Sequence, residues 1–182
     1  MEFLHSRPDI VRSESQRSLL GRWNVARGAA ALPAWQGLHP DALAVPHDNL
    51  SFLDVVAVNG STRFQIRFHG VRIAELYGSV SCVGRFLDEV VPPALREATL
   101  ATYRHAVVHR LPVYTISDTR DATGRIVHYE RLLLPLTGDG AGVAHILASL
   151  ETVSPEGVFD NHGLMTATGR SPAFALCTAI VE

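Results

Sequence analysis

The chain has 182 residues, of which 47 % are hydrophobic and 19 % are charged, and its formal net charge is −2. This length favours one domain with extensions, and the composition supports a packed core and argues against disorder. Without a basic excess, there is no electrostatic reason to expect a nucleic acid or a membrane as a partner. All 16 basic residues are arginine, which excludes a mechanism that needs a lysine amine.

The first predicted element is a helix that begins at Ser13. Ser13 followed by Gln16 fits a capping box at a helix start. Leu19, Leu20 and Trp23 follow at helical spacing and form an apolar stripe. This helix needs an apolar surface to lie on, whereas the residues before it are predicted to form a loose arm.

Two strands are predicted next, at residues 50–58 and 63–70. In the second strand, apolar and polar residues alternate strictly. The alternation places Phe64, Ile66 and Phe68 on one face, which predicts a half-buried strand.

Three helices are predicted between the second and third strands. Two are short, at residues 71–78 and 85–90, and the longest covers residues 92–110. Proline at the start of the long helix costs no hydrogen bond. Its apolar face includes Tyr103 and Val107.

Three further strands are predicted at residues 113–119, 126–136 and 143–153, joined by glycine-containing loops. Residues 132–134 are all leucine, so this strand must be covered on both faces. We expect the other predicted helices to cover one face and the helix that begins at Ser13 to cover the other.

This order of elements matches the PAS fold, and the sequence resembles a bacterial family of single PAS-domain proteins over about residues 18–153. The resemblance rests on residues 19–43, 52–56, 63–78, 84 and 129–147. It departs from the family pattern at Val71, where the family has threonine, and at residues 81–83, where the family has an acidic residue and a threonine.

The resemblance implies an α+β fold with a five-stranded antiparallel sheet, helices on its concave face and an added N-terminal helix. We expect an arm at residues 1–12, the PAS domain at 13–154 and a tail at 155–182. In the tail, Ser171-Pro172 is a candidate start of a short helix that carries Phe174, Leu176 and Ile180, and the alternatives are a disordered tail or a docking segment. The function implied is a sensory or regulatory module without catalytic activity. Two alternatives are a structural dimerisation module with a filled core, and an enzyme or carrier on a curved-sheet cone fold.

A PAS cavity lies between the concave face of the sheet and the helices, and we expect this one to take a small, mostly apolar ligand. The predicted lining is Phe68, Ile73, Leu76, Phe86, Tyr103, Val107, Tyr129, Arg131 and Ile146.

Arg131 is the most informative residue of this set because an arginine in an apolar strand must be paired or solvated. Strand alternation places Tyr129 and Arg131 on one face and Glu130 on the other. Arg131 either pairs with a carboxylate, such as that of Glu75 or Asp88, or recognises an anionic or carbonyl-bearing ligand.

We expect no metal and no cofactor. His105 and His109 have a spacing that can hold a metal, but a structural site needs four ligands. His69, His105 and His128 are the candidate axial ligands of a haem, and a lone histidine does not define such a site. Cys82 does not lie in a flavin photoadduct motif, and no catalytic motif is present.

The two cysteines, Cys82 and Cys177, form no paired motif, which indicates a reducing compartment. No secretory signal or membrane-length apolar run is present, so we expect a cytoplasmic protein. We also expect a signalling partner protein, and a homodimer that involves the N-terminal helix, because one sheet face is not expected to bury the stripe of Leu19, Leu20 and Trp23 completely.

Overall fold

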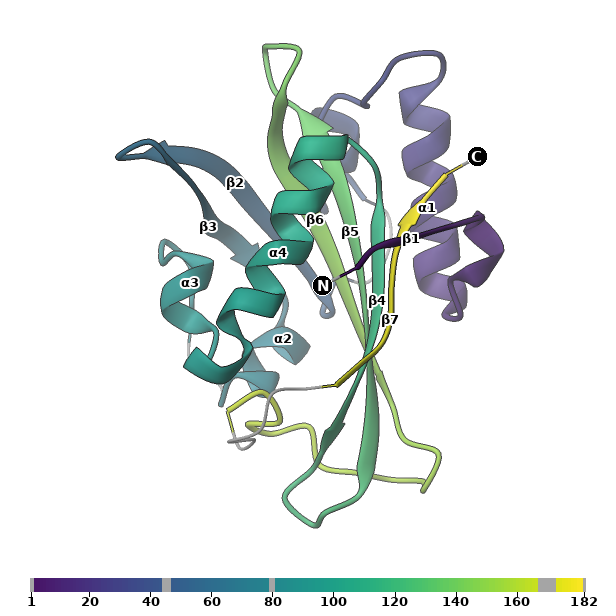
Figure 1. The fold of residues 1–182 in the computed structure, drawn as a ribbon, viewed down its shortest axis with the longest axis vertical. Helices are drawn as coiled ribbons and strands as arrows, with labels where there is room; N and C mark the ends of the chain where they lie inside the picture. The colour runs from purple at the N-terminus through teal and green to yellow at the C-terminus, as the bar shows by residue number, and fades with distance from the viewer. Residues whose placement is uncertain (1, 44–46, 79–80, 167–172, 182) are drawn as a thin grey trace.

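In the computed structural model, which describes residues 2–43, 47–78, 81–166 and 173–181, one mixed sheet forms the centre of the protein (Figure 1). Seven strands pair in the order β1-β7-β4-β5-β6-β2-β3. They are β1 (Leu4–Ser6), β2 (Leu50–Val58), β3 (Ser61–His69), β4 (Val113–Arg120), β5 (Ile126–Thr137), β6 (Val143–Val153) and β7 (Ala173–Ile180). The α+β class and the five predicted strands are confirmed, and two strands were not foreseen.

Helices cover both faces of this sheet (Figure 1). Those of four or more residues are α1 (Glu14–Arg27), α2 (Val71–Leu76), α3 (Leu87–Val90) and α4 (Pro93–His109). Helices α2, α3 and α4 lie on one face, and α1 lies on the other. Short 3-10 turns occur at Pro8–Ile10, Gln36–Leu38 and Pro40–Ala42.

The leucines of β5 belong to two separate apolar cores. Leu133 packs in the core on the α2–α4 side, whereas Leu132 and Leu134 pack in the core beneath α1. All three side chains are fully buried. The expectation that both faces of this strand are covered is confirmed.

Helix α1 fits the sheet through polar as well as apolar groups. Ser13 caps the helix, as predicted: its hydroxyl oxygen accepts a hydrogen bond from the backbone N–H of Gln16. The Gln16 side chain does not form the second hydrogen bond of a capping box, which would join it to the backbone of Ser13. It is fully buried and donates to the backbone carbonyls of Glu130 and Ser149, at 3.4 and 3.2 Å. Gln16 therefore contacts two neighbouring strands, which makes the expected capping box only half correct.

The apolar stripe of α1 is used inside the protomer. Leu19, Leu20 and Trp23 are each no more than 5 % exposed, and Trp23 Nε1 donates to the carbonyl of Pro135 at 2.8 Å. The expectation that one face of the sheet leaves this stripe partly exposed is therefore wrong, whereas a homodimer that involves the N-terminal helix stays a prediction.

Both ends of the chain differ from the predicted arm and tail. Strand β1 pairs in parallel with β7, and β7 pairs antiparallel with β4. Phe174, Leu176 and Ile180 therefore lie on a strand, not on a helix, and the predicted helix start at Ser171-Pro172 lies outside the described residues. Sequence alternation in this segment is weak, and the pairing depends on the free edge that β4 offers.

Candidate functional site

A small cavity lies between the sheet and the helices α2, α3 and α4. Its volume is about 30 Å³, enough for about two water molecules. Apolar side chains of β2, β3, α2 and α3 form most of the wall. The polar groups that border it are Ser51, His69, Tyr77, Tyr103, Tyr129 and Arg131.

The predicted lining residues fall into three groups. Those that border the cavity are Ile73, Tyr103, Tyr129 and Arg131. Those that belong to the same core, or pack against it, without bordering the cavity are Leu76, Val107 and Ile146. Those that lie elsewhere are Phe68 and Phe86. Whether any of them binds a ligand stays a prediction.

Phe68 faces the opposite core because β3 contains a β-bulge. Phe52 pairs with Phe68, but the next residue of β2, Leu53, pairs with Ile66. One extra residue in β3 reverses the alternation, so Phe68 packs in the core beneath α1 while Ile66 borders the cavity. The strict alternation in the sequence concealed this irregularity.

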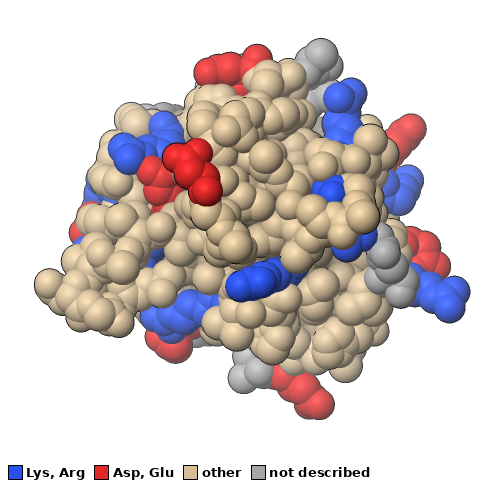
Figure 2. Space-filling model, turned by 90° about the horizontal axis from the view of Figure 1, so that it is seen from above, with Lys and Arg blue, Asp and Glu red and all other residues tan. Residues whose placement is uncertain are grey.

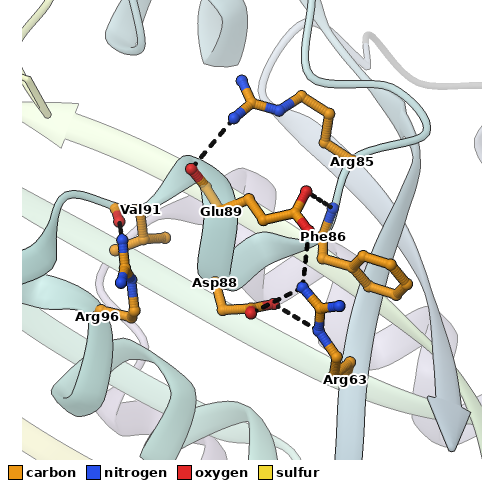
Figure 3. A network of polar contacts seen from close by, with 7 residues as sticks. All are labelled: Arg63, Arg85, Phe86, Asp88, Glu89, Val91 and Arg96. Carbon is orange, nitrogen blue, oxygen red and sulfur yellow. Dashed lines mark hydrogen bonds and ion pairs between the residues drawn. The ribbon is translucent and has the colours of Figure 1, made fainter. Parts of the chain in front are cut away.

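Phe86 lies at the outer edge of the sheet, under the guanidinium of Arg63 (Figure 3). Arg63 also makes a two-pronged ion pair with Asp88, at 3.1 and 2.8 Å, and contacts Glu89 at 2.8 Å. These contacts raise the pKa of Arg63 and lower that of Glu89. Asp88 is thus engaged outside the cavity and is not the partner of Arg131.

Arg131 is a buried cation without a carboxylate partner among the described residues. It is 3 % exposed, and neither Glu75 nor Asp88 pairs with it, so that expectation is wrong. One guanidinium nitrogen donates to the Tyr129 hydroxyl at 2.6 Å, and Nε has no hydrogen-bond partner in the described part of the chain. The rings of Tyr103 and Tyr129 lie 5.7 and 5.1 Å from the guanidinium carbon. Ring contacts of this kind compensate only part of the lost hydration.

The neighbouring tyrosines supply no negative charge. Burial raises the pKa of Tyr103 to about 12, and burial likewise raises the pKa of Tyr77. Both therefore remain neutral phenols at physiological pH. Burial is also the largest influence on the pKa of Arg131 and acts to lower it, but this pKa stays above its ordinary value and the guanidinium stays protonated.

Several groups at the cavity were not predicted from the sequence. Tyr77 follows Ile73 by four residues, so the spacing of one helix face could have indicated it. His69 was considered only as a haem ligand. Its Nε2 accepts from the Cys82 amide at 2.9 Å and its Nδ1 lies 3.3 Å from the Gly70 carbonyl. Both ring nitrogens are therefore engaged. Burial raises the pKa of Cys82, which keeps this thiol protonated and unreactive.

The other histidines that were weighed lie outside the cavity. His105 stacks on Phe3, with ring centroids 3.6 Å apart, and its ring centroid lies 4.1 Å from that of the tilted His109 ring. His128 contacts Asp118 at 2.7 Å on the partly exposed part of the sheet. In the part of the chain that the structure covers, no three His, Cys, Asp or Glu side chains gather in a way that could hold a metal.

Surface charges of both signs are interspersed on the face shown in Figure 2. This face carries no continuous basic patch of the kind that binds nucleic acid. Within the described ranges, no helix has the length and apolar character needed to cross a membrane.

A polar cluster lies on the other side of the sheet from the cavity. Glu130, 4 % exposed, accepts from the Tyr114 hydroxyl at 2.6 Å, and that hydroxyl accepts from the Arg12 amide at 3.2 Å. Burial, followed by the contact with Glu130, raises the pKa of Tyr114. The predicted alternation of residues 129–131 is confirmed. Because of it, neighbouring residues of β5 contact the cavity on one face and the start of α1 on the other.

The comparison with protein families agrees with this architecture. The family described as "PAS domain" matches residues 11–151. A solved structure entitled "The light state structure of the blue-light photoreceptor Aureochrome1 LOV" is 15 % identical, and the match covers 65 % of this chain and 91 % of that chain with a TM-score of 0.43. No match was found among curated proteins.

Proposed function

Since this chain belongs to the PAS domain family, a family of sensory and regulatory modules, we propose that it senses a small molecule in the cavity beside Arg131 and signals to a partner protein. The observation that carries the proposal is the buried guanidinium at the cavity wall, with one hydrogen bond and an unpaired Nε. A buried charge left in this state costs several kcal/mol. A ligand that binds the guanidinium would offset this free-energy cost.

Strand β5 offers a direct route from the cavity to α1. Tyr129 and Arg131 border the cavity, and Glu130 between them contacts the α1 side. Gln16 of α1 holds the backbone carbonyl of Glu130. A small shift of β5 on ligand binding would therefore change the hydrogen bonds that fix the start of α1. We propose α1 as the element that reports the state of the cavity.

The homodimer and the signalling partner remain predictions. Any interface must use a surface other than the stripe of Leu19, Leu20 and Trp23, since that stripe is buried within the protomer. Val25, on the outer side of α1, is 84 % exposed and is therefore available to a partner.

No catalytic role is proposed. The Cys82 thiol is protonated, and the His69 nitrogens are both engaged within the protein, so neither residue is poised as a nucleophile or a base. Membership of the PAS family rules out the cone fold on which the enzyme or carrier alternative was based. A purely structural module is the second candidate, and the small volume of the cavity, about 30 Å³, favours it.

A thermal-stability screen of small metabolites separates these two functions. The wild type would be compared with Ile73→Phe, which fills the cavity, and with Val25→Ala, which changes an exposed residue of α1. A sensory module predicts a compound that raises the melting temperature of the wild type and of Val25→Ala but not of Ile73→Phe. The structural module is favoured if no compound acts, or if the filled variant responds equally.

A further inference from the structure

We propose that the ligand of this cavity is a small monovalent oxyanion, such as a short carboxylate, that pairs with Arg131. This inference rests on the proposed sensory function and specifies its ligand. Three independent features of the cavity support it, namely its charge, its set of hydrogen-bond donors and its size.

The charge of the cavity is positive and uncompensated. Two carboxylates that could compensate it make other contacts: Asp88 pairs with Arg63 at the sheet edge, and Glu130 accepts from Tyr114 on the opposite face. Among the described residues that border the cavity, none carries a carboxylate. One negative charge from a ligand would restore neutrality, whereas a neutral ligand would leave the guanidinium unpaired.

The polar groups of the cavity are mainly donors. Arg131 Nε is buried without an acceptor. No described residue accepts a hydrogen bond from the hydroxyls of Tyr77 or Tyr103, which border the cavity as neutral phenols. The Tyr129 hydroxyl accepts from Arg131 and so retains its own proton for donation. An oxyanion, which only accepts, satisfies such a set.

The size of the cavity restricts the anion. A volume of about 30 Å³ corresponds to about two waters, and hence to a ligand of about two to four non-hydrogen atoms. A second, smaller space of about 10 Å³ also borders Tyr129 and Arg131, so Arg131 borders two spaces. The planar guanidinium matches a planar carboxylate geometrically. Leu53, Ile66 and Ile73 would face the apolar end of a short carboxylate.

The test uses sodium formate and the full-length ¹⁵N-labelled protein. The Nε–H resonances of the arginines would be followed by NMR during the titration, with sodium sulfate holding the ionic strength constant, since sulfate is divalent and larger. Arg131→Met identifies the Arg131 resonance, and Arg104→Gln, an exposed change on α4, serves as the matched control.

We expect a saturable shift of the Arg131 Nε resonance in the wild type and in Arg104→Gln, together with a rise in melting temperature that is lost in Arg131→Met. Tyr103→Phe should bind formate about three- to tenfold more weakly, the usual effect of one hydrogen bond. The inference is overturned if the wild-type resonance does not shift, or if Arg131→Met gains the same stability from formate.

The two proposals fail in distinguishable ways. If formate has no effect but a neutral compound stabilises the wild type and not Ile73→Phe, the oxyanion is wrong and the sensory cavity stands. If neither formate nor any screened compound stabilises the protein, both proposals fail, and water alone solvates Arg131.

Discussion

Glu130 and Arg131 are adjacent and oppositely charged, yet they lie on opposite faces of β5 and do not pair with each other. Both are buried, at 4 % and 3 % exposure. Glu130 accepts a hydrogen bond from the Tyr114 hydroxyl beneath α1. Among the described residues, the only side chain that accepts a hydrogen bond from Arg131 is Tyr129, at the cavity. The difference between these two environments is the basis of the functional account.

Arg131→Met should leave the ligand-free protein equally stable or make it more stable, by up to about 4 kcal/mol, because an unpaired buried charge is replaced by an apolar chain of similar length. Urea unfolding of the wild type and the variant in formate-free buffer measures this. A loss of about 3–5 kcal/mol would instead mean that Arg131 pairs with a buried carboxylate.

Gln16→Ala should lower the free energy of unfolding by about 1–3 kcal/mol, because the backbone carbonyls of Glu130 and Ser149 lose a buried donor. Ser18→Ala, an exposed change on the same helix, is the control and should have little effect. Equal stabilities of the two variants in urea would contradict the role of Gln16 in fixing α1 to the sheet.

The hydrogen bonds of the Asp121 carboxylate predict that the folded protein loses stability in acid. The side-chain hydrogen bond from Thr123 is the main cause that lowers its pKa from 3.8 to about 2, with further help from the amides of Arg125, Asp160 and Thr123. Because the folded-state pKa lies below the unfolded one, the stabilisation is complete above about pH 4 and disappears as the pH falls toward 2.

Asp121→Asn should therefore be less stable than the wild type at neutral pH, and the difference should shrink between about pH 4 and pH 2. Urea unfolding at a series of pH values checks this, with Asp139→Asn, an exposed loop change, as the control. A difference that does not depend on pH would show that the loss is not caused by the charge of Asp121.

The regular parts of the fold could be predicted from the sequence because they follow from local patterns. The start of α1 at Ser13 is encoded by its capping residue, and the two-sided cover of β5 follows from residues 132–134. Strand β7 could not be predicted because it forms by pairing with β4 at long range. Local propensity says little about such an edge strand.

The candidate site was predictable only in part, for a similar reason. Tyr129 and Arg131 follow from alternation in a long, regular strand. Phe68 was misplaced because the bulge in β3 is imposed by its pairing with β2. The partner expected for Arg131 was wrong because the position of Asp88 beside Arg63 depends on tertiary packing, which spacing in the sequence does not reveal.

The central claim is that the cavity and α1 communicate through β5. Hydrogen–deuterium exchange of the full chain, with and without saturating sodium formate at constant ionic strength, tests it most directly. The account predicts that exchange changes both at residues 129–131 and in α1, Glu14–Arg27, and that the same change is absent in Arg131→Met. Altered exchange at the cavity with no change in α1 would contradict it.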